Sequence, residues 1–138
     1  MFLQSQLLQN GALAPVIKVG NLDSLRTWSD VRDAVRAYHM LVTINPTAGE
    51  YYNIGGTHTC TVREMLQYLL ELSTVKDIQI KIDPGRLRPI DADLQVPDTT
   101  KFKKHTGWAP RISFEKTMKD LLDYWRNIIN SGKECLNR

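Results

Sequence analysis

Two arginines of this 138-residue chain have sequence surroundings that suit them to bind an anion. Arg26 is expected in a loop between a strand and the start of a helix, where side chains project freely and backbone N–H groups are available. Arg88 precedes Pro89, which biases its backbone toward an extended conformation. A guanidinium meets closely spaced anionic oxygens, such as those of a diphosphate, with two parallel hydrogen bonds. The alternative for Arg26 is a surface ion pair with Asp23 or Asp30.

Other common catalytic and cofactor motifs are missing from the sequence. Cys60 and Cys135 form no Cys-x-x-Cys pair, and the three histidines lack metal-ligand spacing, so redox and zinc chemistry are not indicated. No tyrosine is followed four residues later by lysine, and no glycines are spaced as Gly-x-Gly. The lone Gly55-Gly56 pair is more typical of a tight turn than of a phosphate loop. We therefore expect this chain to bind neither a metal nor a cofactor, and we assign no catalytic residue.

The composition is that of one compact domain spanning residues 1–138, with 42% hydrophobic and 24% charged residues. Eighteen Lys and Arg against fifteen Asp and Glu give a net charge of +3, too small for a nucleic-acid or anionic-membrane surface. A cluster of lysines at positions 101, 103 and 104 is interpreted as a solvated face. Neither a transmembrane span nor a secretory signal is found, which favours a soluble, cytoplasmic protein.

Hydrophobic periodicity predicts short strands alternating with helices. Three or so strands among four or five helices form less sheet than a doubly wound domain, so this α/β chain looks like half of a two-lobed protein. Strands are expected over 16–19, 51–54 and 78–82, the last half-buried, and loops over 22–26 and 86–97. Helices are expected over 2–9, from Thr27 or Ser29 to about Ile44, and from the capping box Thr61-x-x-Glu64 through Leu72. Two more are expected near 99–105, stopped by Gly107, and from Ser113 to Gly132.

The helix that ends near Ile44 has apolar and charged residues on different predicted faces. We expect its apolar residues to face the core and its charged residues to face solvent. The apolar set is Val31, Ala34, Val35, Tyr38 and Leu41, and the charged set is Asp30, Arg32, Asp33 and Arg36.

Four groups of residues, in a characteristic order and spacing, resemble the carboxy-terminal substrate domain of an extended short-chain dehydrogenase/reductase. The resemblance covers about residues 12–130 and is greatest to the GDP-mannose 4,6-dehydratase family, with the GDP-4-keto-6-deoxymannose reductase as a near relative. The groups are Val16-Ile-Lys-Val-Gly-Asn-Leu-Asp-Ser-Leu-Arg-Thr-Trp28 with Asp30-Val-Arg-Asp33, Tyr52-Asn-Ile-Gly-Gly56, Arg86-Leu-Arg-Pro-Ile-Asp91, and Thr106-Gly-Trp-x-Pro110.

The resemblance implies roles for five residues. In such an enzyme the arginines at the positions of Arg26 and Arg88 contact the substrate diphosphate. The family usually has Glu where Asp91 stands, and that carboxylate accepts hydrogen bonds from ribose hydroxyls; the alternative for the shorter Asp91 is a turn cap. Asn21 and Leu22 fall in a loop that runs beside the nucleoside in the family, and their alternative is simple turn chemistry.

By the same resemblance, a full-length enzyme binds NADP in an amino-terminal Rossmann lobe that also carries the catalytic Tyr-x-x-x-Lys. This sequence contains none of that lobe, so we expect the chain alone to be inactive. The leading hypothesis is a GDP-mannose-binding lobe of a GDP-mannose 4,6-dehydratase-like enzyme. Alternatives are a fragment of the reductase or of another nucleotide-sugar epimerase or dehydratase, and a non-catalytic binding or assembly module. A separate Rossmann lobe and further copies of the chain are the partners left open.

Overall fold

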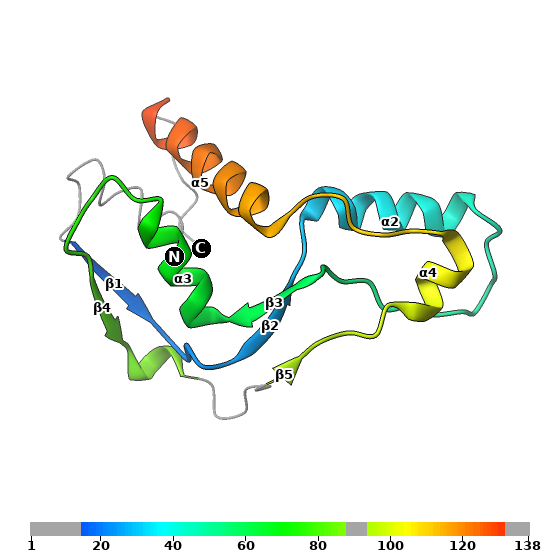
Figure 1. Cartoon of the computed structure of the whole chain (residues 1–138), viewed down its shortest axis with the longest axis horizontal. Coiled ribbons are helices and arrows are strands. Elements are labelled where there is room, and N and C mark those ends of the chain that lie inside the picture. Colours follow the sequence, from blue (N-terminus) through cyan, green and yellow to red (C-terminus); the bar gives the residue numbers. More distant parts are fainter. Residues whose placement is uncertain (1–14, 88–93, 132–138) are drawn as a thin grey trace. The chain divides into compact units, whose positions relative to one another are not determined.

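The computed structural model describes residues 15–87 and 94–131 (Figure 1). They form short strands and helices, which confirms the predicted α/β class. The chain divides into two compact units: the first unit holds the residues up to Ser24, Thr61–Asp91 and the residues from Met118 onward, and the second unit holds Leu25–Cys60 and Ala92–Thr117. The predicted helix over 2–9 lies outside the described residues.

The first unit contains a parallel pair of strands, β1 (Val16–Val19) and β4 (Gln79–Ile82), in the register Val16↔Gln79 to Val19↔Ile82 (Figure 1). Their β-branched residues favour the extended backbone. On β1, Ile17 and Val19 are buried and alternate with exposed Lys18, as period-two packing requires. All of β4 is exposed, so the half-buried face predicted for it is wrong.

Helix α3 (Val62–Glu71) packs Leu66 against the buried residues Ile17, Val19 and Leu22 of the first unit. Burying an aliphatic side chain of this kind contributes roughly 1.5–3 kcal/mol. The capping box at the start of α3 is confirmed: the Glu64 N–H donates to Thr61 Oγ1 at 3.1 Å, and the Thr61 N–H donates to Glu64 Oε2 at 2.7 Å.

The second unit contains a three-stranded sheet in the order β3-β2-β5. It consists of β2 (Leu25–Trp28), β3 (His58–Thr61), of which the first three residues belong to this unit, and β5 (Leu94–Gln95). Strands β2 and β5 run parallel in the register Leu25↔Leu94 and Arg26↔Gln95. The predicted loop 22–26 is therefore wrong at its end, because Leu25 and Arg26 belong to a strand.

The strand predicted over 51–54 is not formed, and the nearest strand is β3, which begins after the glycine pair. The close contacts of Gly55 and Gly56 explain why this turn needs glycine. A Cβ atom there would lie 1.7 Å from the Trp28 carbonyl oxygen, and one on Gly55 would lie 2.6 Å from the Pro97 ring. Gly56 therefore allows the segment before β3 to lie close to β2, and Gly55 allows it to lie close to Pro97.

Helices α2 (Val31–Thr43) and α4 (Thr100–Thr106) complete the core of the second unit with Ala37, Phe102 and Trp108. Helix α4 ends as predicted at Gly107, whose φ of 71° is left-handed. Helix α2 begins later than predicted, because Asp30 is its N-cap: the Arg32 N–H donates to Asp30 Oδ1 at 2.8 Å.

The predicted burial of α2 is wrong for three of its five apolar residues and for Asp33. Val31, Val35 and Tyr38, expected in the core, are 72%, 59% and 61% exposed, whereas Asp33, expected in solvent, is 2% exposed. The small Ala37 lies on the buried face, and Leu41 packs on the same core as predicted. Hydrophobic spacing identified the helix but did not identify its buried face.

Helix α5 (Phe114–Asn130) begins in the second unit and continues into the first. Ser113 caps it as predicted, because the Lys116 N–H donates to Ser113 Oγ at 3.2 Å. Gly132, the predicted end of this helix, lies outside the described residues. Within 15–87 and 94–131, no helix is both long and apolar enough to cross a membrane.

Candidate functional site

Arg26, the first predicted anion ligand, lies in the middle of the sheet of the second unit. It is half-buried, and its Nη1 atom is buried. The parallel pairing of β2 with β5 places its backbone opposite Gln95. Its side chain therefore projects from a hydrogen-bonded strand rather than from the loop expected from sequence, which gives it a more rigid base.

A surface hollow of about 490 Å³ adjoins the β2–β5 pair in the same unit. Thr27 of β2, Asn53 and Leu94–Pro97 line this hollow, and Arg26 does not. Successive side chains of a strand point to opposite faces, so Arg26 projects from the face of β2 opposite Thr27. The Thr27 hydroxyl hydrogen-bonds with that of Thr59 at 3.0 Å, which ties β2 to β3.

Arg88 and Asp91, the other two predicted ligands for the diphosphate and ribose, lie outside the described residues. In sequence they come directly after Leu87 and shortly before Leu94, the first residue of β5. Their predicted roles stay predictions.

Asn21 and Leu22 lie in the turn between β1 and β2 in the first unit. The Asn21 side chain donates to Ser24 Oγ at 2.9 Å and accepts from the Asp23 N–H at 2.9 Å. Leu22 is 3% exposed and packs in the core of that unit. Both side chains therefore have turn or core contacts, and their predicted position beside a nucleoside stays a prediction.

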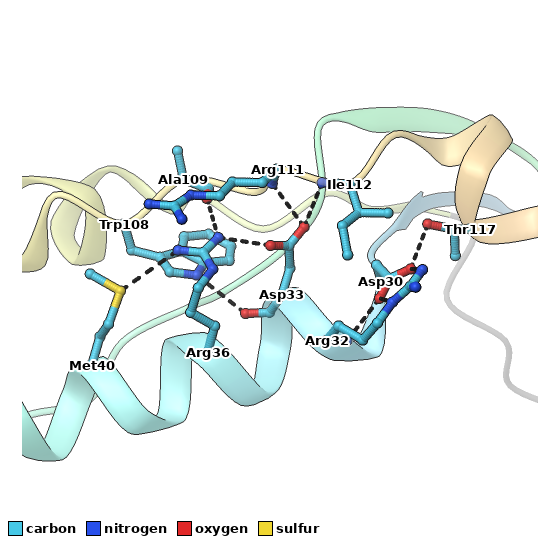
Figure 2. Close-up of polar contacts among 10 residues, drawn as sticks. All are labelled: Asp30, Arg32, Asp33, Arg36, Met40, Trp108, Ala109, Arg111, Ile112 and Thr117. Atoms are coloured by element: carbon cyan, nitrogen blue, oxygen red, sulfur yellow. Dashed lines mark hydrogen bonds and ion pairs between the residues drawn. The ribbon is translucent and has the colours of Figure 1, made fainter. Parts of the chain in front are cut away.

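Asp33, on the buried face of α2, connects the helix to the segment that precedes α5 (Figure 2). Its Oδ2 atom accepts the backbone N–H groups of Arg111 and Ile112 at 2.8 and 2.9 Å. Its Oδ1 atom accepts Arg36 Nη2 at 2.7 Å. One carboxylate thus fixes a loop 78 residues away in sequence.

Burial alone would raise the pKa of Asp33, but the hydrogen bonds from Arg36, Ile112 and Arg111 outweigh it, and the pKa is lowered. Asp30 is held more strongly in its charged form. The Arg32 guanidinium donates from Nε to Oδ1 at 2.8 Å and from Nη2 to Oδ2 at 2.7 Å, and the Thr117 hydroxyl also donates to Oδ2 at 2.9 Å. These contacts, with the Arg32 side chain first, lower the pKa of Asp30 well below its usual range despite burial.

Trp108 fills the space beside this contact (Figure 2). It is 1% exposed, and its Nε1 atom donates to the Asp33 carbonyl oxygen at 3.2 Å. Arg36 lies over the Trp108 ring at 5.6 Å and donates to the Ala109 carbonyl oxygen at 2.5 Å. Two of the motifs that carry the family resemblance therefore meet here as scaffold.

Sequence reasoning missed this cluster because it assigned Asp33 to a solvated face. The available signal was the spacing of Asp33 and Arg36, which at i,i+3 are neighbours on a helix. No local pattern indicated the backbone donors Arg111 and Ile112, which come from a distant segment.

A second polar cluster lies on the surface of the second unit, beside α4. Lys101 forms an ion pair with Glu50 and lies 4.7 and 5.0 Å above the rings of Tyr51 and Tyr52. His105 hydrogen-bonds with the Tyr52 hydroxyl through Nδ1 and with a backbone carbonyl oxygen through Nε2. These partners belong to the fold itself, so the cluster tethers the segment 50–52 to α4.

Gly55 and Gly56, the one glycine pair of the sequence, form the close-packed turn that was expected for them: they lie against the Pro97 ring and the Trp28 carbonyl. Within 15–87 and 94–131, no three His, Cys, Asp or Glu side chains gather as a metal site. What the described part of the chain offers is Arg26 on the central strand of a sheet, on the face opposite Thr27 and the hollow that Thr27 lines.

Comparison with known proteins assigns the family. The family model described as GDP-mannose 4,6 dehydratase matches residues 5–121. The GDP-6-deoxy-D-mannose reductase of Pseudomonas aeruginosa is 27% identical over 120 residues, which cover 87% of this chain and 39% of the relative. The GDP-mannose 4,6-dehydratase of Yersinia enterocolitica is 25% identical over 138 residues, with 80% and 37% covered. A structure of RMD from Pseudomonas aeruginosa complexed with NADPH has a TM-score of 0.80 at 25% identity, covering 91% of this chain and 41% of that one.

The fold is that of part of an extended short-chain dehydrogenase/reductase. The chain belongs to the GDP-mannose 4,6-dehydratase family. It spans about two fifths of the length of the curated relatives that it matches.

Proposed function

We propose that this chain is the nucleotide-sugar-binding lobe of a GDP-mannose 4,6-dehydratase-like enzyme. It would hold GDP-mannose through the diphosphate, with Arg26 and Arg88 as ligands and Asp91 near the ribose. The main support is the parallel β2–β5 pairing, which aligns Arg26 with Gln95, four residues beyond Asp91, in a chain matched to the family over residues 5–121. Its contribution to catalysis is binding and orientation of the hexose.

The chemistry of this binding is charge-assisted. A guanidinium on a strand presents two donors in a fixed plane, which match two oxygens of a diphosphate. Arg26 is only half-buried, so it acts partly next to solvent and the interaction is weak. We expect a dissociation constant on the order of millimolar.

The test is ligand-detected saturation-transfer NMR with GDP-mannose. Arg26→Lys keeps the charge but removes the bidentate geometry, and Arg88→Ala removes the charge, so both should reduce the transfer. The matched controls are Arg63→Lys and Arg63→Ala, because Arg63 is an exposed arginine of α3 whose partner is Asp23. We expect the Arg63 variants to behave as wild type. Equal transfer for all five proteins would favour the alternative of a module without nucleotide-sugar binding.

A GDP-4-keto-6-deoxymannose reductase lobe is the second candidate, supported by the similarity to the Pseudomonas aeruginosa reductase. Both enzymes act on a GDP-linked hexose, so the two arginines would have the same role. Comparing GDP-mannose with GDP-6-deoxy-D-mannose in the same NMR experiment separates the candidates, because stronger transfer to the deoxy sugar favours the reductase.

A further inference from the structure

A second surface hollow, of about 410 Å³, lies beside α4 and shares no lining residue with the hollow at β2 and β5. Its volume falls within the roughly 300–1,000 Å³ of small-molecule sites. The coil that follows α2 runs past α4 and forms one side, and α4 forms the other (Figure 1). Both sides belong to the second unit. We call it the α4 hollow; its lining residues are Thr47, Glu50, Tyr52, Lys101, Lys104 and His105.

The α4 hollow has an excess of positive charge. Lys101 and Lys104 are three residues apart on the helix, so they lie on the same side of it. Glu50 is the one carboxylate among the lining residues, and it forms an ion pair with Lys101. Lys104 makes no ion pair with any residue of 15–87 and 94–131. The pKa of Asp98 is lowered mainly by hydrogen bonds with Thr100 and only last by Lys104, so this lysine keeps a charge available to a ligand.

Neutral hydrogen-bonding groups fix the wall of the same hollow. The Tyr52 hydroxyl and His105 Nδ1 hydrogen-bond with each other at 3.0 Å, and His105 Nε2 bonds with the Asn45 carbonyl oxygen at 2.9 Å. The Thr47 hydroxyl donates to the same carbonyl oxygen at 3.5 Å, a long contact that a charged acceptor can replace. The coil is therefore already held against α4, which lowers the cost of ordering it around a ligand.

We propose that the α4 hollow binds the phosphate group of a small phosphate monoester. Lys104 supplies the main cation and Thr47 a neutral donor. A phosphate monoester carries a charge of about −1.5 to −2 at pH 7 and three acceptor oxygens, which suit an ammonium and a hydroxyl. Glu50 is an internal competitor, because its carboxylate occupies Lys101, the second cation of the site. This function goes beyond nucleotide-sugar binding and uses none of the residues proposed for it.

The test is an NMR titration of the isotope-labelled 138-residue chain with inorganic phosphate and with glucose 6-phosphate. Sodium chloride at matched ionic strength separates binding from screening. We expect saturable shifts of the backbone amides at positions 47, 50, 101, 104 and 105, with dissociation constants on the order of millimolar. Equal affinities would assign the site to free phosphate, and tighter binding of the sugar phosphate would assign it to the ester.

Three charge variants make the titration specific. Lys104→Gln should weaken phosphate binding about fivefold, because it removes the unpaired cation. Lys103→Gln is the matched control: it removes the same charge from the same helix, but Lys103 does not line the hollow, so the affinity should stay within about twofold of wild type. Glu50→Gln should tighten binding about threefold, because it removes the competing carboxylate and releases Lys101. Unchanged amide shifts elsewhere in each variant verify its fold.

The proposal is overturned if phosphate shifts these amides no more than chloride does, if Lys103→Gln weakens binding as much as Lys104→Gln, or if Glu50→Gln leaves the affinity unchanged. The lysines would then be the solvated face expected from sequence, stabilising the carboxyl end of α4. Arg26→Lys should leave phosphate binding at the α4 hollow unchanged. A failure of this site is thereby distinguished from a failure of nucleotide-sugar binding.

Discussion

Asp33 accepts hydrogen bonds from three groups that lie on two separate parts of the second unit. Taking a carboxylate out of water is costly unless its oxygens are paired and hydrogen-bonded. Here Arg36 supplies the charge and the backbone N–H groups of Arg111 and Ile112 supply the remaining donors. The residue therefore determines how α2 meets the segment before α5.

Asp33→Asn should destabilise the chain by roughly 3 kcal/mol, because it leaves Arg36 without its charged partner and replaces an acceptor with a donor. Urea unfolding measures the change in free energy of unfolding. Asp123→Asn is the control, since Asp123 makes two ion pairs near the surface and should cost about 1 kcal/mol or less. Equal losses for the two variants would contradict the role of burial.

Acid should destabilise the wild type through Asp30 and Asp33, whose pKa values are lowered in the fold. Above the unfolded pKa of about 3.9, both carboxylates are charged and their stabilisation is complete. As the pH falls below about 4, the unfolded chain binds protons first, and the stabilisation is lost progressively toward the lower folded pKa. Thermal unfolding between pH 6 and pH 3 should show a smaller decline for Asp33→Asn than for wild type; parallel curves would disprove this linkage.

At the scale of elements, the close approach of β2 to the turn before β3 organises the sheet of the second unit. Trp28 contributes twice, through its carbonyl against Gly56 and through Nε1, which donates to the Cys60 carbonyl oxygen at 3.3 Å. Arg26 lies two residues earlier on the same strand, so its position depends on this packing.

Gly56→Ala should cost about 2 kcal/mol or more, because its Cβ would lie 1.7 Å from a backbone oxygen that cannot move without the strand. Gly85→Ala is the matched control: its Cβ would meet only Asp83 Oδ1, at 3.4 Å. Denaturant unfolding of both variants measures the difference. If Gly56→Ala were as stable as Gly85→Ala, the two elements would not approach as described.

At the scale of the whole molecule, part of the apolar surface of α2 is exposed. Three of the five apolar residues expected in the core by periodicity, Val31, Val35 and Tyr38, are 72%, 59% and 61% exposed, and Val42 is 68% exposed. Exposed apolar residues gathered on one helix form a surface that small hydrophobic molecules can bind.

The isolated chain should therefore bind a hydrophobic dye such as anilinonaphthalene sulfonate. Replacing Val35 and Val42 together by Ser should lower the dye fluorescence by about half, with an unchanged far-UV circular dichroism spectrum. Ile82→Ser, which removes an exposed apolar side chain of β4 rather than of α2, should have a much smaller effect. No dye binding by the wild type would argue against an exposed apolar surface on α2.

The sequence by itself determined the features that depend on residues a few positions apart. The capping box of α3, the Ser113 cap of α5 and the left-handed Gly107 all followed from local chemistry. The ordered motifs also indicated the family, which the match over residues 5–121 confirmed. Arg26 was identified in this way as a candidate ligand, and its role stays a prediction.

Tertiary structure alone decided which surfaces meet. Helical spacing makes α2 amphipathic, but whether its apolar stripe or its Asp33 face is buried depends on the donors of Arg111 and Ile112 and on the shape of Trp108. Arg26 lies in a strand because β2 pairs with β3 on one side and with β5 on the other, and both come from distant parts of the chain. Such long-range contacts have no local signal, because their free energy depends on groups that the chain brings together only when it folds.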